Sequence, residues 1–188
     1  DRKRKFPVTT LLKCLISNVS EPYLDECNKK NVEADPKKVQ GMTNEEILSF
    51  FYESIELKAD KYGWSSKLDL SFYKGKVLNI DILNAKNGKV ILEKGTKVTQ
   101  RIINEIHNKK INLFSLSNES IIGNFIADDI IEESSGKIYY EAGNEIDEDF
   151  ISFTVEKKIK KINILKVDNV DIGPYIRSTL QLDKARSR

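Results

Sequence analysis

The chain has 188 residues, of which 39% are hydrophobic and 32% are charged, and its formal net charge is +2. This composition is that of a globular protein with a modest core, and the near balance of charge does not favour any one class of partner. No apolar run approaches the roughly 20 residues that a membrane-spanning helix needs, so we expect a soluble, cytoplasmic protein.

The residue types that most often build redox or metal sites are scarce. Cys14 and Cys27 are the two cysteines, and His107 is the single histidine. The sequence shows no signal-peptide pattern, so we expect both thiols to be free. One histidine without carboxylates placed around it does not predict a metal site.

The first half of the chain predicts two helices separated by a polar excursion. Residues 9–16 predict a short helix, and Thr43 with Glu46 forms a capping-box pattern that opens a second helix extending to Phe51. The segment between them, residues 17–41, predicts a loop or a partly helical excursion. Between residues 55 and 83, alternating segments such as 68–72 and 77–82 predict strands.

The second half of the chain contains an apparent internal repeat. The segment GKVILEKG at residues 88–95 is echoed by GKIYYEAG at 136–143. After a small length change, residues 110–113 match residues 161–164, and both copies close on Ile-Gly, at 122–123 and at 172–173. Repeats of this kind indicate tandem copies of one small structural unit.

Each copy predicts the same succession of elements. A turn at residues 87–88 or 135–136 starts a short strand, which a second glycine ends. Thr99 or Asp147 then caps a helix whose apolar face is predicted from the spacing of its hydrophobic residues. Those residues are Ile102, Ile103 and Ile106 in the first copy, and Phe150, Ile151 and Val155 in the second. A closing strand follows, at residues 111–116 or 159–167.

Four segments resemble, in order along the chain, the bacterial RNA polymerase β subunit. They are DRKRKFPVTTLLK at residues 1–13, EEILSFFYE at 45–53, KVILEKGTKVT at 89–99 and GPYIRSTL at 173–180. The second is similar to a family helix that ends in a double aromatic, the third to a K-V-x-x-E-K-G-x-x-I-T segment, and the fourth to a strand-to-helix junction. One departure is the excursion at 17–41, which is longer than the tight link expected in the family.

The resemblance implies that the chain is cut from a longer protein, and that it is the second lobe of the β pincer with a lineage-specific insertion. The expected fold class is α+β. The expected domains are a discontinuous lobe portion (residues 1–83 and 171–188), a first inserted repeat (84–123) and a second inserted repeat (124–170). The two inserted repeats are expected to pack on each other, because a unit of about fifty residues buries little core alone.

The resemblance also implies function and partners. The parent assembly is a DNA-directed RNA polymerase, whereas the isolated fragment is expected not to be an enzyme and to hold no cofactor. The catalytic magnesium is expected in the partner β′ subunit. The implied partners are the β′, α, ω and σ subunits, DNA, and regulators that dock on the inserted module.

The residues expected near DNA are Arg2, Lys3, Arg4 and Arg177. The first three lie in a basic block at one end of the chain, and lysine and arginine contacts with phosphates make DNA binding sensitive to salt. The competing interpretation of the block is a solvated charge run, and a structural salt bridge is nearly as good an interpretation of Arg177. The acidic run at residues 128–133 lacks the ligand spacing of a calcium loop and predicts a solvated turn.

Two other functional classes remain open. A free-standing protein-interaction module with no nucleic-acid role is the alternative to the polymerase lobe. A small RNA-binding domain is disfavoured, because no aromatic-glycine signature of such modules occurs. No catalytic arrangement of nucleophile and base is expected.

Overall fold

The structure is a computed structural model that describes residues 6–18, 20–35, 38–67, 69–78, 80–132, 135–167 and 172–183. Its described part combines seven α-helices with a six-stranded and a two-stranded antiparallel sheet, which confirms the α+β class. Contacts divide the chain into two compact units. The terminal unit comprises Asp1–Ser54, Phe125–Asn144 and Leu165–Arg188, and the sheet unit comprises Ile55–Asn124 and Glu145–Ile164.

These units follow different boundaries from the expected domains. The range 124–170, expected to be one inserted repeat, contributes residues to both units. The range 55–83, expected in the lobe, lies in the sheet unit together with the range expected for the first inserted repeat. The division into a lobe and an inserted module is therefore kept as a prediction about the parent protein.

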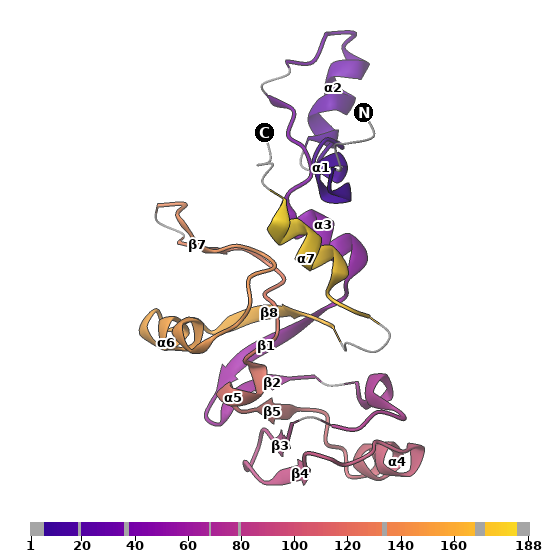
Figure 1. The fold of residues 1–188 in the computed structure, drawn as a ribbon, viewed down its shortest axis with the longest axis vertical. Helices are drawn as coiled ribbons and strands as arrows, with labels where there is room; N and C mark the ends of the chain where they lie inside the picture. The colour runs from indigo at the N-terminus through magenta and orange to yellow at the C-terminus, as the bar shows by residue number, and fades with distance from the viewer. Residues whose placement is uncertain are drawn as a thin grey trace. The chain divides into compact units, whose positions relative to one another are not determined.

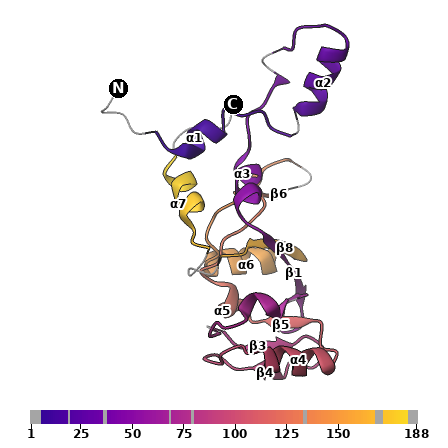
Figure 2. The same ribbon diagram turned by 90° about the vertical axis from the view of Figure 1, so that its right-hand side faces the viewer.

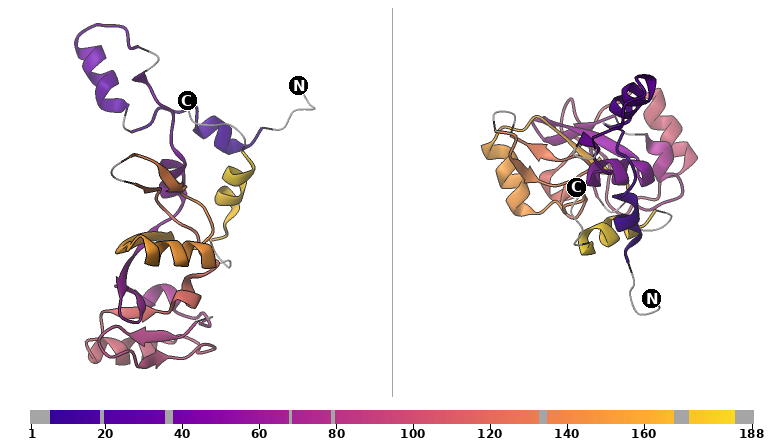
Figure 3. Two further views of the ribbon diagram at one scale, coloured as in Figure 1. Left: turned by 90° about the vertical axis from the view of Figure 1, so that its left-hand side faces the viewer. Right: turned by 90° about the horizontal axis from the view of Figure 1, so that it is seen from above.

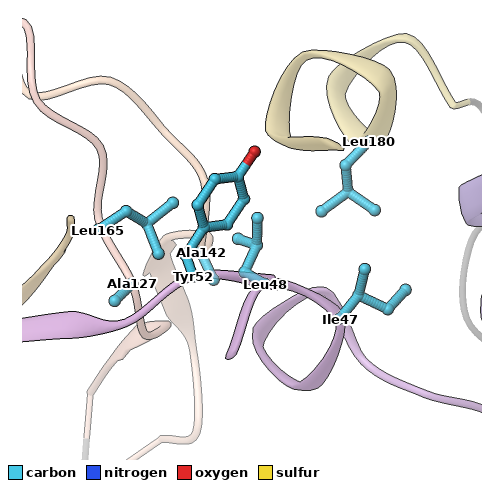
Figure 4. Close-up of a cluster of buried hydrophobic side chains, with 7 residues drawn as sticks. All are labelled: Ile47, Leu48, Tyr52, Ala127, Ala142, Leu165 and Leu180. Carbon is cyan, nitrogen blue, oxygen red and sulfur yellow. The ribbon is translucent and has the colours of Figure 1, made fainter. Parts of the chain in front are cut away.

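The terminal unit is built from helices and one short ribbon. Its elements are α1 (Val8–Leu12), α2 (Glu21–Lys29), α3 (Asn44–Phe51), α7 (Tyr175–Leu182), β6 (Ile130–Ile131) and β7 (Ile138–Tyr140). Side chains from α3 and the residue after it, from α7, from the segments flanking the ribbon and from the end of the strand Lys161–Leu165 form one buried cluster, which Figure 4 shows. The cluster consists of Ile47, Leu48, Tyr52, Ala127, Ala142, Leu165 and Leu180.

The capping-box prediction for α3 is confirmed. The Thr43 hydroxyl accepts the Glu46 N–H, and the Glu46 carboxylate accepts the Thr43 N–H at 2.8 Å. The same carboxylate accepts the Ser17 hydroxyl (2.8 Å) and the Asn18 N–H (3.0 Å). Partial burial opposes ionisation of Glu46, but these hydrogen bonds outweigh it and lower its pKa.

The excursion between α1 and α3 contains α2 and is closed at its base. Ser17 donates its N–H to the Gln40 carbonyl, and Met42 donates to the Leu15 carbonyl. Gly41 passes so close to the end of α1 that a Cβ at this position would clash with the Lys13 carbonyl oxygen, at 1.8 Å. The chain therefore leaves and rejoins the unit at neighbouring points.

The sheet unit is organised around strands in the order β4-β3-β5-β2-β1-β8 (Figure 1). Their bounds are β1 Ser54–Asp60, β2 Gly63–Ser66, β3 Ile82–Asn84, β4 Val90–Leu92, β5 Phe114–Leu116 and β8 Lys161–Leu165. Helices α4 (Gln100–Asn108), α5 (Asn118–Ile121) and α6 (Glu148–Glu156) complete the unit.

A second buried cluster lies between α4 and the strands beside it. Figure 2 shows α4 next to β3 and β4. Ile106 of α4 packs there with Ile82 of β3, Leu92 of β4 and Phe114 of β5, and Val98 joins them from the loop before the helix. Ile82 is only 1% exposed, so the first residue of β3 is part of the core.

Some expectations about the sheet unit are wrong. Residues 70–73 form a 3₁₀ turn that places Leu70 in the core, so the alternation at 68–72 does not mark a strand. Val77 makes only an isolated bridge to Lys97, and the strand begins later, at Ile82. Val155, expected on the apolar face of α6, is 68% exposed, and Thr154 is buried in its place beside Phe150. The buried face of that helix is therefore rotated from the expected one.

Candidate functional site

Two segments of the chain share one path of hydrogen bonds. The first segment is residues 75–116 and the second is residues 123–164, so each position in the second lies 48 residues after its counterpart, as Gly123 does after Gly75. In the first segment, Leu78 donates its N–H to the Thr96 carbonyl (3.0 Å), Gly95 to Leu78 (2.8 Å) and Val98 to Lys76 (2.9 Å). The second segment repeats these bonds in the same order: Ile126 donates to Asn144 (2.9 Å), Gly143 to Ile126 (2.7 Å) and Ile146 to Asn124 (2.8 Å).

The match extends to irregular features of the backbone. Each segment has a register shift at the same place in its first strand pair, between Ile82 and Leu83 and between Ile130 and Ile131. Lys110 and Lys158, one past each helix cap, both adopt positive φ, at 52° and 53°. The two segments therefore share irregular backbone features as well as hydrogen bonds.

The register of this match differs from the one expected from sequence. Gly123 corresponds to Gly75 and begins the second segment, so the Ile-Gly pair at 122–123 does not close the first. The constant spacing of 48 residues also makes β5 the counterpart of residues 162–164 in β8, so the length change expected between the two copies does not occur. The similar sequence of the two segments begins at the turn before β4, whereas their first parts share backbone hydrogen bonds but few residues.

The two segments carry opposite charge. The first has eight basic and three acidic residues, a formal charge of +5, and the second has five basic and ten acidic residues, a formal charge of −5. The overall charge of +2 conceals this difference. A field of one sign attracts partners of the other sign, so the two segments favour partners of opposite charge.

The strand pairing of the two segments also differs. In the first, β3 pairs on one side with β4 and on the other with β5, through Leu83 opposite Ser115 and Asn84 opposite Phe114. In the second, β6 and β7 form a separate two-stranded sheet, and β8 lies beside β1 in the six-stranded sheet. Within the described residues, β6 therefore has a strand on one side only.

Carboxylates gather at the start of β6 in the terminal unit. Partial burial, followed by the nearby carboxylates of Asp128 and Asp129, raises the pKa of Glu45 above its ordinary value. Asp129 also accepts the Ala142 N–H at 2.6 Å, as Asp81 accepts the Lys94 N–H at 2.6 Å in the first segment. Repulsion between these carboxylates marks a region of negative potential.

The first and last helices of the described chain are joined by a buried carboxylate. Asp183, which follows α7, accepts the hydroxyls of Thr9 (2.7 Å) and Thr10 (3.0 Å), and the Lys13 ammonium lies 3.8 Å away. The Asp183 side chain is only 2% exposed. Figure 3 shows α1 and α7 adjoining, which confirms, for the described residues, that the terminal segments lie side by side.

A tyrosine holds the other end of α7. The residue before this helix, Pro174, provides no side-chain cap. Instead, the Tyr52 hydroxyl donates to the Gly173 carbonyl (3.1 Å) and accepts the Ile176 N–H (3.2 Å), which satisfies one of the unpaired donors of the first turn. The hydroxyl is directed away from the apolar cluster in Figure 4.

Of the residues expected near DNA, the structure describes only Arg177. Its Nε donates to the Gly143 carbonyl at 2.6 Å, and its guanidinium carbon lies 4.1 Å from the centre of the Phe125 ring. These contacts hold the side chain within the terminal unit. The structural salt bridge expected as the alternative for Arg177 stays a prediction. Arg2, Lys3 and Arg4 lie outside the described residues.

Sequence reasoning missed the two groups that organise this end of the chain, Asp183 and Tyr52. A carboxylate directly after the last helix is a weak signal, because nothing in the sequence links it to the two threonines in the first helix and the lysine after that helix; Thr9 and Asp183 are 174 positions apart. Tyr52 is part of the double-aromatic segment, but its hydroxyl contact depends on a tertiary approach.

Other expected groups show no functional arrangement in the part of the chain that the structure covers. Cys14 and Cys27 are free thiols, as expected, the first exposed and the second buried. Among the described residues, no three His, Cys, Asp or Glu side chains are placed to hold a metal ion. No described helix has the length and apolar character needed to cross a membrane.

Comparison with known proteins identifies the family. No family model matches the chain. The DNA-directed RNA polymerase subunit beta of Agrobacterium fabrum is 34% identical over 188 residues, and that of Rickettsia bellii is 39% identical over 189 residues. Each match covers 100% of this chain and 12% of the length of the relative. The chain belongs to the family of DNA-directed RNA polymerase β subunits, in which it matches one segment of the subunit.

Proposed function

We propose that the chain forms the non-catalytic second lobe of a bacterial RNA polymerase β subunit, with an inserted module built from an internal repeat. The observation that carries this proposal is the match to β subunits along the whole chain. The contact between α1 and α7 supports it, because a lobe that accommodates an insertion must hold its first and last elements together.

In this proposal the lobe supports DNA-templated transcription by contacting DNA near the active-site cleft. The contacts come from Arg2, Lys3 and Arg4. Arg177 is the weaker candidate, because its Nε is already hydrogen-bonded within the terminal unit. The catalytic magnesium belongs to the β′ subunit, and this chain contributes support and position to the assembly.

The proposed partners are the β′, α, ω and σ subunits, DNA, and regulators that dock on the repeated module in the cytoplasm. The opposite charges of the two segments support a docking role, because each segment favours a different partner chemistry. The alternative, a free-standing protein-interaction module, rests on the same charge contrast but requires no polymerase.

The test is a salt titration of promoter binding by polymerase assembled with the full β subunit. Replacing Arg2 and Arg4 with Ala should flatten the log–log salt dependence by roughly 0.9 per lost phosphate contact, so by about 1.8 for both. The matched control replaces two other basic residues with Ala: Arg101, which lies in the first turn of α4 and has an 87% exposed side chain, and Lys109, which follows the helix. The control should leave the slope unchanged.

Substitutions are preferable to deleting residues 84–170. That deletion would remove Ala127, Ala142 and Leu165 from the core of the terminal unit, so weaker DNA binding would report a damaged lobe. If the α4 variant flattens the slope and the Arg2 and Arg4 variant does not, the DNA contact is assigned to the wrong segment. If the subunit does not assemble into polymerase, the free-standing module is the better interpretation.

A further inference from the structure

We propose that the free side of β6 binds an extended peptide segment of a docking protein, which adds to the ribbon as a strand and carries lysine or arginine after its apolar residues. This proposal rests on the docking role given under the proposed function. It specifies β6 as the docking surface and an extended, basic peptide segment as the partner.

The first segment of the chain shows what a complete version of this site looks like. There, β3 is paired on both sides, with β4 and with β5. Its counterpart β6 repeats the pairing with β7, including the register shift, and no described strand occupies the other side. The same backbone that binds a strand in the first segment is thus available in the second.

The backbone of Ile131 is directed toward the available side. Glu132 donates its N–H to the Lys137 carbonyl, across the ribbon, at 2.8 Å. Successive residues of an antiparallel strand direct their backbone groups to opposite edges, so the N–H and C=O of Ile131 face away from β7. An extended peptide bound here would satisfy both groups.

Apolar side chains on the ribbon match such a partner. Ile131 is 50% exposed and Ile138, opposite it, is 45% exposed. Two β-branched side chains paired across a ribbon form an apolar patch, and a side chain of a strand added beside β6 would pack next to Ile131 and extend that patch. In the first segment the strand in this place is β5, with the sequence Phe114-Ser115-Leu116.

The register of the first segment also predicts where the partner carries its charge. Leu83 lies opposite Ser115 in the first segment, so a peptide bound to β6 would place its serine equivalent opposite Ile131. Because the peptide runs antiparallel to β6, its residues after this serine lie opposite the residues before Ile131. The C-terminal end of the peptide therefore approaches Asp129 and Asp128. Basic residues there would lie near the carboxylates of Asp128 and Asp129, whose negative charge attracts them.

The experiment uses polymerase assembled with the full β subunit and a fluorescent synthetic peptide, INLFSLKK, which copies residues 111–116 and adds two lysines. Fluorescence anisotropy measures its binding. Ile131→Lys keeps the backbone but places a charge on the edge, and Ile131→Pro removes the N–H donor. The matched control is Val90→Lys, since Val90 is the counterpart of Ile138 in the segment whose β3 is already paired.

We expect the peptide to bind wild-type polymerase and the Val90→Lys control equally, and both Ile131 variants at least roughly tenfold more weakly. The peptide KKINLFSL, with the two lysines at its other end, should bind more weakly than INLFSLKK, and only INLFSLKK should lose affinity with Asp128→Asn. Absence of binding, equal binding to the Ile131 variants, or equal binding of the two peptides would overturn the proposal. Promoter-dependent transcription by the same preparations separates the two claims: active polymerase without peptide binding refutes only this inference, and failed assembly refutes the proposed function.

Discussion

The two segments at 75–116 and 123–164 keep the same backbone hydrogen bonds but differ in charge and in their third strand. The first lies wholly in the sheet unit and encloses a core of its own, which includes Val98, Ile106 and Phe114. The second is divided between the two units, and its Ala127 and Ala142 pack in the terminal unit. The two segments thus share turns and backbone hydrogen bonds, whereas their surroundings decide which side chains are buried and which strand edges are paired.

The largest expected difference concerns the core positions of β5 and β8. Phe114→Ala should destabilise the chain by about 3 to 5 kcal/mol, because it leaves a cavity in a dense cluster. The counterpart Ile162→Ala should cost about 2 to 3 kcal/mol, since a smaller side chain is removed. Urea unfolding measures both. Equal losses would show that the two cores are equally packed, despite the different strand pairing.

Matched glycines provide a second comparison. Gly95 and Gly143 have φ of 86° and 89°, but a Cβ at 95 would meet nothing within 4 Å, whereas one at 143 would lie 3.2 Å from Leu48 Cδ1. Gly95→Ala should therefore cost about 1 kcal/mol for backbone strain alone, and Gly143→Ala about 2 to 3 kcal/mol. Thermal unfolding of the two variants measures this, and a greater loss at position 95 would contradict the packing described around Leu48.

The helix caps should differ by less. Asp147 accepts the Phe150 N–H at 2.8 Å, whereas Thr99 accepts the Ile102 N–H at 3.4 Å. Asp147→Ala should cost about 1 kcal/mol, and Thr99→Ala roughly half as much, because the aspartate makes the shorter bond and its charge favours the helix N-terminus. Asp147→Asn, which keeps the acceptor, separates the hydrogen bond from the charge in the same unfolding measurement.

The smallest expected effect is a gain of stability at the acidic start of β6. The pKa of Glu45 is raised in the folded chain, so its ionised form is disfavoured there and the stability associated with protonation is lost as pH rises through that pKa. Glu45→Gln should thus stabilise the chain at pH 7 by about a few tenths of a kcal/mol, given solvent screening. The difference should vanish below about pH 4, where the carboxyl is protonated in both states. Unfolding midpoints from pH 3 to 7 measure it; a destabilised variant at pH 7 would contradict the unfavourable burial and charge repulsion at Glu45.

Local signals in the sequence predicted local structure well. The capping box at Thr43 and Glu46, the helix caps Thr99 and Asp147, and the turns near Gly88 and Gly136 all lie where short-range hydrogen bonds determine the conformation. The resemblance to the polymerase β subunit was also confirmed. The α+β class followed from the same elements.

Tertiary contacts decided what the sequence did not predict. Within the stretch expected as a strand, the residues from Leu70 onward fold as a 3₁₀ turn (Leu70–Tyr73), in which Leu70 packs in the core, and alternation alone does not distinguish a strand from such a turn. The start of each segment, at Gly75 and Gly123, was missed because the surrounding residues differ and only the hydrogen bonds are shared. Asp183 and Tyr52 join distant parts of the terminal unit, so their roles could not be found from spacing.

The closed base of the excursion at residues 17–41 has a consequence for sequence evolution and for engineering. Because the Ser17–Gln40 and Leu15–Met42 hydrogen bonds fix where the chain leaves and returns, the entropy cost of a longer excursion grows only slowly with its length. Lineages can therefore extend or shorten it without altering the core around Leu48. A reporter domain inserted after Asn31, in a turn of positive φ next to the exposed Val32, would use the same tolerance.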